Sequence, residues 1–222
     1  VADEKFKLKE IVGTLPFALL VSRPSSTSRG AGLILPVSSL PSPYAIGDMG
    51  QQAHHFVNFL SEGLQKYWQM LPINPISAGC AYSPYSSYSS MARNILLISP
   101  EELVRQGWLT DAEAKAVHAP QGKNIDYDQA ATVKLTLFKK AWKRFRRAAT
   151  YDEKNNFESF KSTEAYWLDD FALYVGLKAN QNDRPWHQWQ QPYRDRDAKA
   201  LGQFSRSEKD LIDEVKWCQY NF

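Results

Sequence analysis

Two short apolar runs separated by a helical pattern constrain the fold of this chain more than any other feature. The first run, AGLILPV, covers residues 31–37, and the second, YWQML, covers residues 67–71. A continuous apolar run of this length is typical of a strand buried on both faces. Four apolar residues between the runs recur at helical spacing: Ala53, Phe56, Val57 and Leu60. The stretch therefore predicts a βαβ unit with two parallel strands.

Each predicted strand is followed by a loop rich in Ser, Tyr and Pro. The loop at 38–48 reads SSLPSPYAIGD, and the loop at 73–90 reads INPISAGCAYSPYSSYSS. Both leave the C-terminal ends of parallel strands, where barrels and open sheets place their ligand-contacting loops, so the two loops should be neighbours. Tyrosine and serine offer aromatic faces and neutral hydrogen-bond partners, which suit a sugar, although an ordinary rigid loop has the same composition. Asp48 is expected to cap the helix, with Gln51 completing a capping box.

Beyond residue 98 the sequence predicts helices. Ser99 and Thr110 each precede a helical start, with Glu102 and Glu113 three residues after them. A long amphipathic helix is expected at 128–149. One side of it is basic: Lys134, Lys139, Lys140, Lys143, Arg144, Arg146 and Arg147. This side indicates either nucleic-acid binding or a solvated surface, and the absence of a groove-reading motif favours the surface. Two further helices are expected at 164–178 and from residue 207.

Composition bounds the class of protein. The 222 residues are 43% hydrophobic, with a net charge of +3, which allows a real core and does not itself call for nucleic acid or a membrane. Cys80 and Cys218 lie far apart without metal-ligand spacing, so we expect no disulfide and a cytoplasmic location. The helical pattern that runs to Phe222 without a stop signal suggests a chain that is cut there, and residues 1–29 are expected to form an appendage and linker.

The sequence offers no convincing catalytic group. Cleavage of a glycosidic bond needs two carboxylates that flank it. The adjacent Asp169 and Asp170 should point apart on a helix, Asp195 and Asp197 lie among arginines, and Asp48 is assigned to a cap. The four histidines have no metal-ligand spacing, and no GxSxG, GxxxxGK[ST] or GxGxxG motif occurs. We therefore predict no catalytic residue, metal or cofactor in this chain.

Several segments, taken in order, resemble a known family. They are RGAGLILPVSSLPSPYAIGDMG, YWQMLPINP, AYSPYSSYSS followed by Asn94, YWLDDFALYVGLK and PWHQW. They resemble the N-terminal part of amylomaltase (4-alpha-glucanotransferase, or disproportionating enzyme), which is glycoside hydrolase family 77. The match covers most of residues 29–222, and the combination SSLPSPY, YWQMLP and SPYSSYS is specific to this family.

The resemblance implies an α/β fold in which residues 30–98 form the first two strands of a (β/α)8 TIM barrel with sugar-lining loops. Residues 99–222 would then be a largely helical insertion subdomain. It also implies a retaining transfer of α-1,4-glucan segments between maltooligosaccharides. The family's catalytic Asp, Glu and Asp come later in the chain than this sequence reaches, so the chain alone is expected to be inactive.

By the same resemblance, five residues are expected to bind substrate: Ser83, Tyr85, Ser39, Tyr44 and Asn94. The implied partners are maltooligosaccharides and α-1,4-glucans derived from starch or glycogen, without nucleic acid, membrane or cofactor. Two alternatives stay open. One is a non-catalytic carbohydrate-binding or interaction module derived from the family, and the other is a basic helical module for nucleic acid at residues 134–147.

Three positions depart from the family's usual glycine. They are Ala45, Leu64 and Arg93. Such glycines typically adopt a positive φ or allow close backbone approach, so replacing them has a cost. Gly63 is expected to take over the role lost at Leu64, by a shift of one residue.

Overall fold

The structure of the protein is a computed structural model that describes residues 30–120 and 122–222. The chain divides into two units, Val1–Gly30 and Ala31–Phe222, and every element that the structure describes belongs to the second unit. The appendage predicted for residues 1–29 lies outside the described residues.

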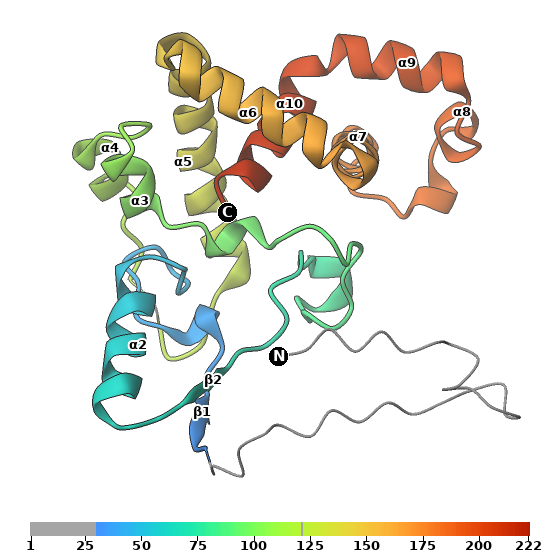
Figure 1. The fold of residues 1–222 in the computed structure, drawn as a ribbon. Helices are drawn as coiled ribbons and strands as arrows, with labels where there is room; N and C mark the ends of the chain where they lie inside the picture. The colour runs from blue at the N-terminus through green and yellow to red at the C-terminus, as the bar shows by residue number, and fades with distance from the viewer. Residues whose placement is uncertain (1–29, 121) are drawn as a thin grey trace, which may run out of the picture. The chain divides into compact units, whose positions relative to one another are not determined.

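The predicted βαβ unit is present. Strand β1 (Gly32–Ile34) pairs in parallel with strand β2 (Tyr67–Gln69), and helix α2 (Gln51–Glu62) connects them (Figure 1). Gly32 lies opposite Tyr67, and a Cβ atom on Gly32 would lie 2.3 Å from the Tyr67 carbonyl oxygen. The close approach of the two strands therefore requires glycine at this position.

The prediction that the first strand is buried on both faces is wrong. All three residues of β1 are exposed, and so is Tyr67 in β2. The sheet has only these two strands within the described residues, and α2 packs beside it through Phe56, whose ring meets Trp68 edge-on at 4.9 Å. An apolar run indicates a strand, but its burial depends on neighbouring elements that the run itself does not reveal.

The start of α2 also differs from the prediction. Gly50 occupies the N-cap position, and no side chain caps the helix. Asp48 accepts a hydrogen bond from the Gly50 N–H (3.1 Å) and forms an ion pair with Lys134 of a distant helix (2.9 Å). Ala53 and Leu60 are buried as predicted, whereas Val57 is exposed.

The rest of the described chain is helical, as the sequence indicates. The described residues also contain four short 3₁₀ helices: η1 (Val37–Ser39), η2 (Ala78–Cys80), η3 (Ile95–Leu97) and η4 (Trp186–Gln188). The α-helices are α3 (Pro100–Arg105), α4 (Asp111–Lys115), α5 (Tyr127–Ala148), α6 (Tyr151–Thr163), α7 (Ala165–Asn180), α8 (Gln191–Arg194), α9 (Ala198–Ser207) and α10 (Lys209–Tyr220). The predicted Ser99 cap and the Thr110–Glu113 capping box are both confirmed.

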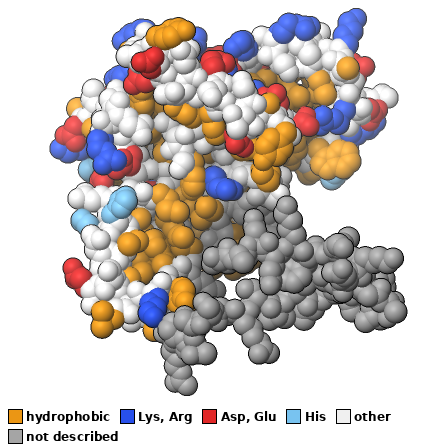
Figure 2. Space-filling model, viewed as in Figure 1, with side chains coloured by type: hydrophobic (Ala, Val, Ile, Leu, Met, Phe, Trp, Pro, Cys, Tyr) orange, Lys and Arg blue, Asp and Glu red, His pale blue; other side chains and the backbone are white. Residues whose placement is uncertain are grey.

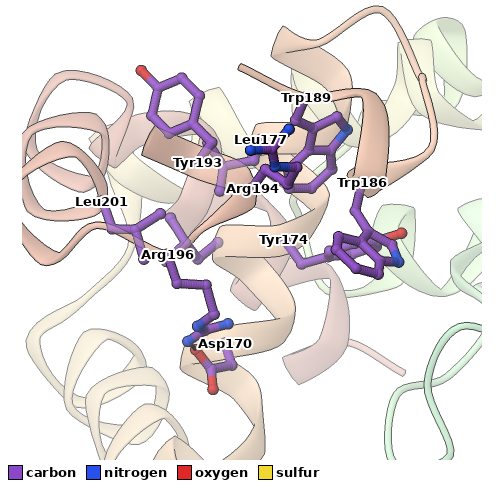
Figure 3. Close-up of a pocket in the computed structure, with 10 residues that line it drawn as sticks. Asp170, Tyr174, Leu177, Trp186, Trp189, Tyr193, Arg194, Arg196 and Leu201 are labelled. Atoms are coloured by element: carbon purple, nitrogen blue, oxygen red, sulfur yellow. Dashed lines mark hydrogen bonds and ion pairs between the residues drawn. The ribbon is translucent and has the colours of Figure 1, made fainter. Parts of the chain in front are cut away.

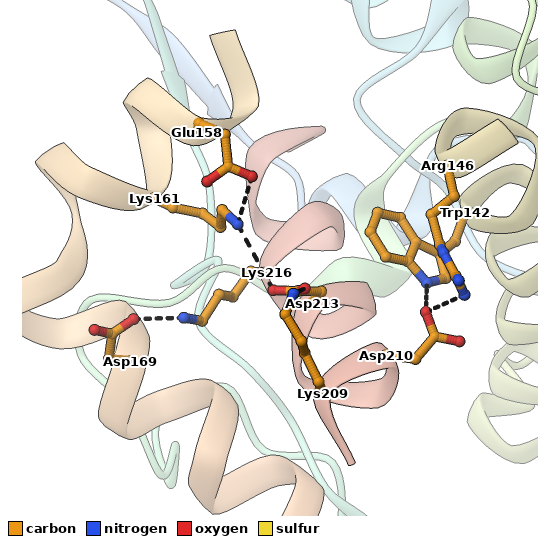
Figure 4. A network of polar contacts seen from close by, with 9 residues as sticks. All are labelled: Trp142, Arg146, Glu158, Lys161, Asp169, Lys209, Asp210, Asp213 and Lys216. Carbon is orange, nitrogen blue, oxygen red and sulfur yellow. Dashed lines mark hydrogen bonds and ion pairs between the residues drawn. The ribbon is translucent and has the colours of Figure 1, made fainter. Parts of the chain in front are cut away.

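Helix α10 packs against α5, α6 and α7 (Figures 1 and 4). Its Trp217 is buried in an aromatic cluster with Trp142 and Phe145 of α5 and Phe157 of α6. The ring centroids of Trp217 lie 6.0 Å from Trp142 and 5.8 Å from Phe145. Large aromatic side chains therefore form the main core of the helical part, because each buries a large apolar area.

Ion pairs surround this core on its polar side (Figure 4). Asp210 of α10 accepts a hydrogen bond from the indole N–H of Trp142 (2.9 Å) and pairs with Arg146. Lys216 of α10 pairs with Asp169 of α7 at 2.5 Å. Most of the Lys, Arg, Asp and Glu side chains visible in Figure 2 gather over the helices, while hydrophobic side chains are exposed together below them.

The basic side of α5 is not wholly solvated, which corrects the prediction for Lys134. Its side chain is 0% exposed, and its Nζ donates to Asp48 Oδ2 (2.9 Å) and to the Ile98 carbonyl oxygen (3.0 Å). Burial lowers the pKa of Lys134, and the charge of Asp48 opposes that shift. Arg144 is also engaged, through two hydrogen bonds to Glu113.

Within the described residues, no helix combines the length and the apolar character that a membrane crossing requires.

Candidate functional site

The two loops that follow the strands meet, as predicted from the βαβ topology. A cavity of about 50 Å³ lies where the strands end, and both loops line it. Val37 ends the first apolar run and Ser38 begins the first loop, Ile73 and Pro84 come from the second loop, and Asn94 also lines the cavity. The C-terminal ends of β1 and β2 therefore share one small hollow.

Two asparagine side chains form hydrogen bonds to the backbone and hold the second loop in shape. The side-chain amide of Asn74 donates to the carbonyl oxygens of Ser89 (3.1 Å) and Ser90 (3.0 Å). Asn94 Oδ1 accepts from the Leu96 N–H (3.1 Å) and so caps η3. These bonds tie both ends of the loop to each other and leave its middle free to face solvent.

Helix α10 holds the same loop from outside the βαβ unit. The side-chain amide of Gln219 accepts from the Arg93 N–H (2.8 Å) and donates to the Arg93 carbonyl oxygen (3.0 Å). The Arg93 guanidinium turns to the Met91 carbonyl oxygen (2.7 Å). The long cation at this position is therefore folded against its own loop, and its backbone is paired.

Aromatic side chains of the loop stack on the helices. The ring of Tyr82 lies parallel to Tyr127 at a centroid distance of 4.8 Å, and its hydroxyl donates to Asp128. This hydrogen bond raises the pKa of Tyr82 to about 12. Tyr88 stacks on Phe171 of α7 at 6.1 Å. The sequence predicted no role for either tyrosine, since within this loop only Ser83 and Tyr85 of the SPY motif were expected to bind substrate.

The five predicted substrate-binding residues fall into two groups. Ser83 and Tyr85 flank Pro84, which lines the small cavity, but neither of them lines it. Tyr85 is 73% exposed, and its N–H donates to Ser83 Oγ (3.3 Å). Asn94 lines this cavity. Ser39 is exposed but does not line the cavity.

Tyr44 lies apart from these residues. It is 2% exposed, and its ring meets His118 edge-on at 5.3 Å within the helical core. Burial raises its pKa to about 12. Its backbone is bridged to Ala119, where the Ala45 N–H donates to the Ala119 carbonyl oxygen (2.6 Å). A sequence pattern could not reveal this, because the partner segment lies about 75 residues further along the chain.

A larger cavity of about 340 Å³ borders the second loop on its helical side. Its lining is mainly apolar, from Tyr88 of the loop, Leu135 of α5, Phe171 of α7 and Leu211 of α10. Glu214 also reaches it, and burial raises the pKa of this carboxyl. Four elements that lie far apart in the sequence form this cavity, so no local motif could predict it.

The acidic residues considered for catalysis are engaged elsewhere. Asp169 pairs with Lys216 (2.5 Å), Asp170 pairs with Arg196 (2.8 Å), and Asp195 pairs with Arg194 (2.8 Å). Asp197, although it lies among arginines in the sequence, accepts from the Ala200 N–H and caps α9. No two of these carboxylates flank the cavities described above. Among the described residues, no group of His, Cys, Asp and Glu is placed to hold a metal ion.

Two of the three glycine replacements have the expected left-handed backbone. Ala45 has a φ of 66° and Leu64 has a φ of 55°. Arg93 does not have a positive φ, so its replacement carries no such cost. The prediction that Gly63 takes over the role of Leu64 is wrong, because Gly63 has a φ of −78° and Leu64 itself adopts the left-handed conformation.

Comparisons with known proteins agree along most of the chain. The family model described as 4-alpha-glucanotransferase matches residues 35–222. The 4-alpha-glucanotransferase of Thermus thermophilus is 38% identical over 173 residues, which are 78% of this chain and 33% of that protein. The 4-alpha-glucanotransferase of Aquifex aeolicus is 39% identical over 173 residues, which are 78% of this chain and 34% of that protein.

A solved structure, amylomaltase from Streptococcus agalactiae in complex with acarbose, superimposes with a TM-score of 0.80 at 28% identity. The match covers 88% of this chain and 39% of that one. The chain thus spans about a third of the length of the curated relatives that it matches.

Proposed function

The chain belongs to the 4-alpha-glucanotransferase family, glycoside hydrolase family 77, and from this premise we propose that it is the N-terminal part of an enzyme that transfers α-1,4-glucan segments between maltooligosaccharides. The observation that carries the proposal is the family match over residues 35–222, a range that contains the specific loop motifs. The implied substrates are maltooligosaccharides and glucans derived from starch or glycogen.

In this proposal the chain supplies binding and not bond cleavage. A retaining transfer needs one carboxylate as nucleophile and another as general acid and base, about 5 Å apart. The candidate carboxylates of the chain are occupied by ion pairs and a helix cap. The resemblance assigns the nucleophile, the acid/base and the stabilising aspartate to later barrel strands. The groups of this chain therefore orient the sugar, and other parts of the enzyme break the bond.

Residues 30–98 would be the first two βα units of a (β/α)8 barrel, and residues 99–222 a helical insertion subdomain. The parallel pair of β1 and β2 supports this assignment, since barrels are closed from parallel strands. A cytoplasmic location suits the two free cysteines.

Ser83, Tyr85 and Asn94 are the residues that we assign to the sugar. Asn94 lines the hollow at the C-terminal ends of the strands, and Ser83 and Tyr85 flank Pro84, which also lines it; the aromatic ring of Tyr85 is exposed. Ser39 would bind at the rim of the same face. The burial of Tyr44 favours a supporting role under the first loop, so direct contact of Tyr44 with sugar is the weakest of the five assignments.

The test is a chimera of the Thermus thermophilus relative in which residues 35–222 of this chain replace the matching third of that protein. The chimera is then supplied with maltotriose. The chimera should release glucose and longer oligosaccharides, whereas the 222-residue chain alone should release neither. Tyr85→Ala in the chimera should lower kcat/KM about tenfold, because a stacking face is lost. Tyr151→Ala, which removes an exposed aromatic ring of α6, should leave kcat/KM unchanged.

Two outcomes would contradict the proposal. A folded chimera without transfer activity would show that this chain cannot supply the N-terminal part. Transfer by the 222-residue chain alone would show that it carries its own catalytic carboxylates. Binding of maltotriose to the chain, together with an inactive folded chimera, would favour the alternative of a carbohydrate-binding module.

A further inference from the structure

A third cavity, which has an aromatic lining, lies in the helical part, among α7, η4, α8 and α9. Its volume is about 200 Å³. Four of its lining residues are aromatic: Tyr174, Trp186, Trp189 and Tyr193. This volume is below the range of cavities that enclose a drug-sized ligand. It suits a single ring of a longer chain that continues into solvent.

The aromatic residues of the cavity differ in how far they are exposed. Trp189 is buried, its indole N–H donates to the Arg184 carbonyl oxygen (2.8 Å), and its ring lies 5.4 Å from that of Tyr174. These two rings form a fixed floor. Trp186 is 57% exposed, and no hydrogen bond of its indole N–H occurs within the described residues. An exposed indole beside a packed aromatic floor is an open stacking surface with a free donor.

Asp170 and Arg196 line a part of the cavity away from the tryptophans, whereas Arg194 lies close to Trp189 (Figure 3). Arg196 pairs with Asp170 of α7 at 2.8 Å, and both side chains stay largely exposed. Arg194 pairs with Asp195 through two hydrogen bonds of 2.8 and 3.4 Å. The cationic and anionic groups balance, so the cavity does not favour a charged ligand. They also supply several hydrogen-bond donors and acceptors.

We propose that this cavity is a second binding site for an α-1,4-glucan, separate from the loop at residues 73–90. A glucose ring has apolar C–H faces and an edge of neutral hydroxyls, which complement the aromatic floor and the paired charges. The choice of glucan as the ligand rests on the proposed function. The site would hold one part of a glucan while another part lies at the loops, since the ring of Tyr174 in the floor lies 5.9 Å from that of Tyr88 in the loop.

The experiment follows the indole N–H signals of the ¹⁵N-labelled 222-residue chain during titration with maltotriose. The Trp186 signal should shift and saturate. Trp186→Ala should weaken the affinity of this site about tenfold, read from the Trp189 signal, because the stacking face is lost. Arg196→Asn should weaken it about threefold, since asparagine tolerates the φ of 57° at this position but lacks the guanidinium.

Two control variants separate this site from others. Tyr151→Ala removes an exposed ring of α6 that does not line the cavity, so it should leave the titration unchanged. Tyr85→Ala should abolish any binding at the loops and leave the Trp186 shift intact. Cellotriose, which is β-linked, should shift the Trp186 signal much less than maltotriose does.

Each contrary result has one meaning. A Trp186 signal that does not move with maltotriose overturns the second site, whether or not the loops bind, and an active chimera would still support the proposed function. An equal response to cellotriose overturns the assignment to α-glucans. A Trp186 shift that persists while the folded chimera is inactive keeps the second site and rejects the proposed function.

Discussion

Leu64 occupies the position at the end of helix α2 where glycine is preferred. Its φ is 55°, its N–H donates to the Ser61 carbonyl oxygen (3.0 Å), and the next N–H, of Gln65, donates to that of Leu60 (2.8 Å). These two bonds form a complete Schellman motif, which usually has glycine at the left-handed residue. The Leu64 side chain is 85% exposed, so it gains little packing in return for the backbone cost.

Leu64→Gly should therefore stabilise the protein. The left-handed cost falls while little buried area is lost, and the greater freedom of glycine in the unfolded chain offsets part of the gain, which leaves about 0.5–1 kcal/mol. Urea denaturation would measure the free energy of unfolding. Leu64→Ala keeps the Cβ atom and should show almost no gain, and equal stabilisation by both variants would rule out the backbone explanation.

The pair of Lys134 and Asp48 is the other residue-scale feature with a large expected effect. Lys134→Met leaves the buried carboxylate of Asp48 without its cation, which should cost about 3–5 kcal/mol of unfolding free energy. Adding Asp48→Asn removes the unpaired charge and keeps an acceptor for the Gly50 N–H. The double variant should therefore be more stable than Lys134→Met alone. Additive losses in this double-mutant cycle would show that the two groups are not coupled.

At the scale of elements, an ion pair joins α4 to α5. Two hydrogen bonds from Arg144, with further bonds from Thr110, lower the pKa of Glu113 from 4.5 to about 2. The unfolded chain binds this proton at a higher pH than the folded chain. The stabilisation is therefore complete above about pH 4.5 and is lost as the pH falls toward 2.

Thermal unfolding measured between pH 6 and pH 2 would test this dependence. The difference in Tm between the parent protein and Glu113→Gln should be largest above about pH 4.5 and shrink toward about pH 2. A difference that stays constant over this range would mean that Glu113 is not the titrating group.

Helix α10 is joined through one amide to the segment that follows the loop at residues 73–90. Gln219→Leu would leave the N–H and carbonyl oxygen of Arg93 without their partner, at a cost of about 1–3 kcal/mol. Hydrogen exchange should accelerate at the Arg93 amide and stay unchanged in α9. Retained protection at Arg93 would show that the loop is held by its own bonds, such as those of Asn74.

For the molecule as a whole, local signals predicted more than long-range ones did. The caps at Ser99 and Thr110 and the helices that follow them depend on residues three or four positions apart, and a sequence displays these directly. The burial of Lys134 depends on Asp48, 86 residues earlier, so the helical pattern alone placed it in solvent. The same limit applies to the candidate site. The SPY motif of the loop could be identified from the sequence, but the contact of Gln219 with Arg93 could not, because the two residues lie 126 positions apart.

The exposed sheet gives the molecule-scale prediction. Leu33, Ile34 and Tyr67 are exposed on a two-stranded sheet, and each strand has an edge without a partner strand within the described residues. Such edges pair with other chains. The 222-residue chain should therefore self-associate at micromolar concentration in sedimentation velocity, and Leu33→Thr with Ile34→Thr should reduce it.

Threonine keeps the preference for a strand while it removes apolar surface, so these variants should still fold. Tyr151→Ser, which changes an exposed ring away from the sheet, is the matched control and should not alter self-association. If the control reduces self-association as much as the strand variants do, another surface is responsible.

The bond between Gln219 and Arg93 spans 126 residues, and this separation has a consequence for the order of folding. A chain emerging from the ribosome exposes the loop long before it exposes α10. Helices α3 to α7 can form from local contacts during that interval, whereas the bond to Arg93 must wait for α10 to dock. The segment after the loop therefore gains this bond later than α3 to α7 gain their local contacts.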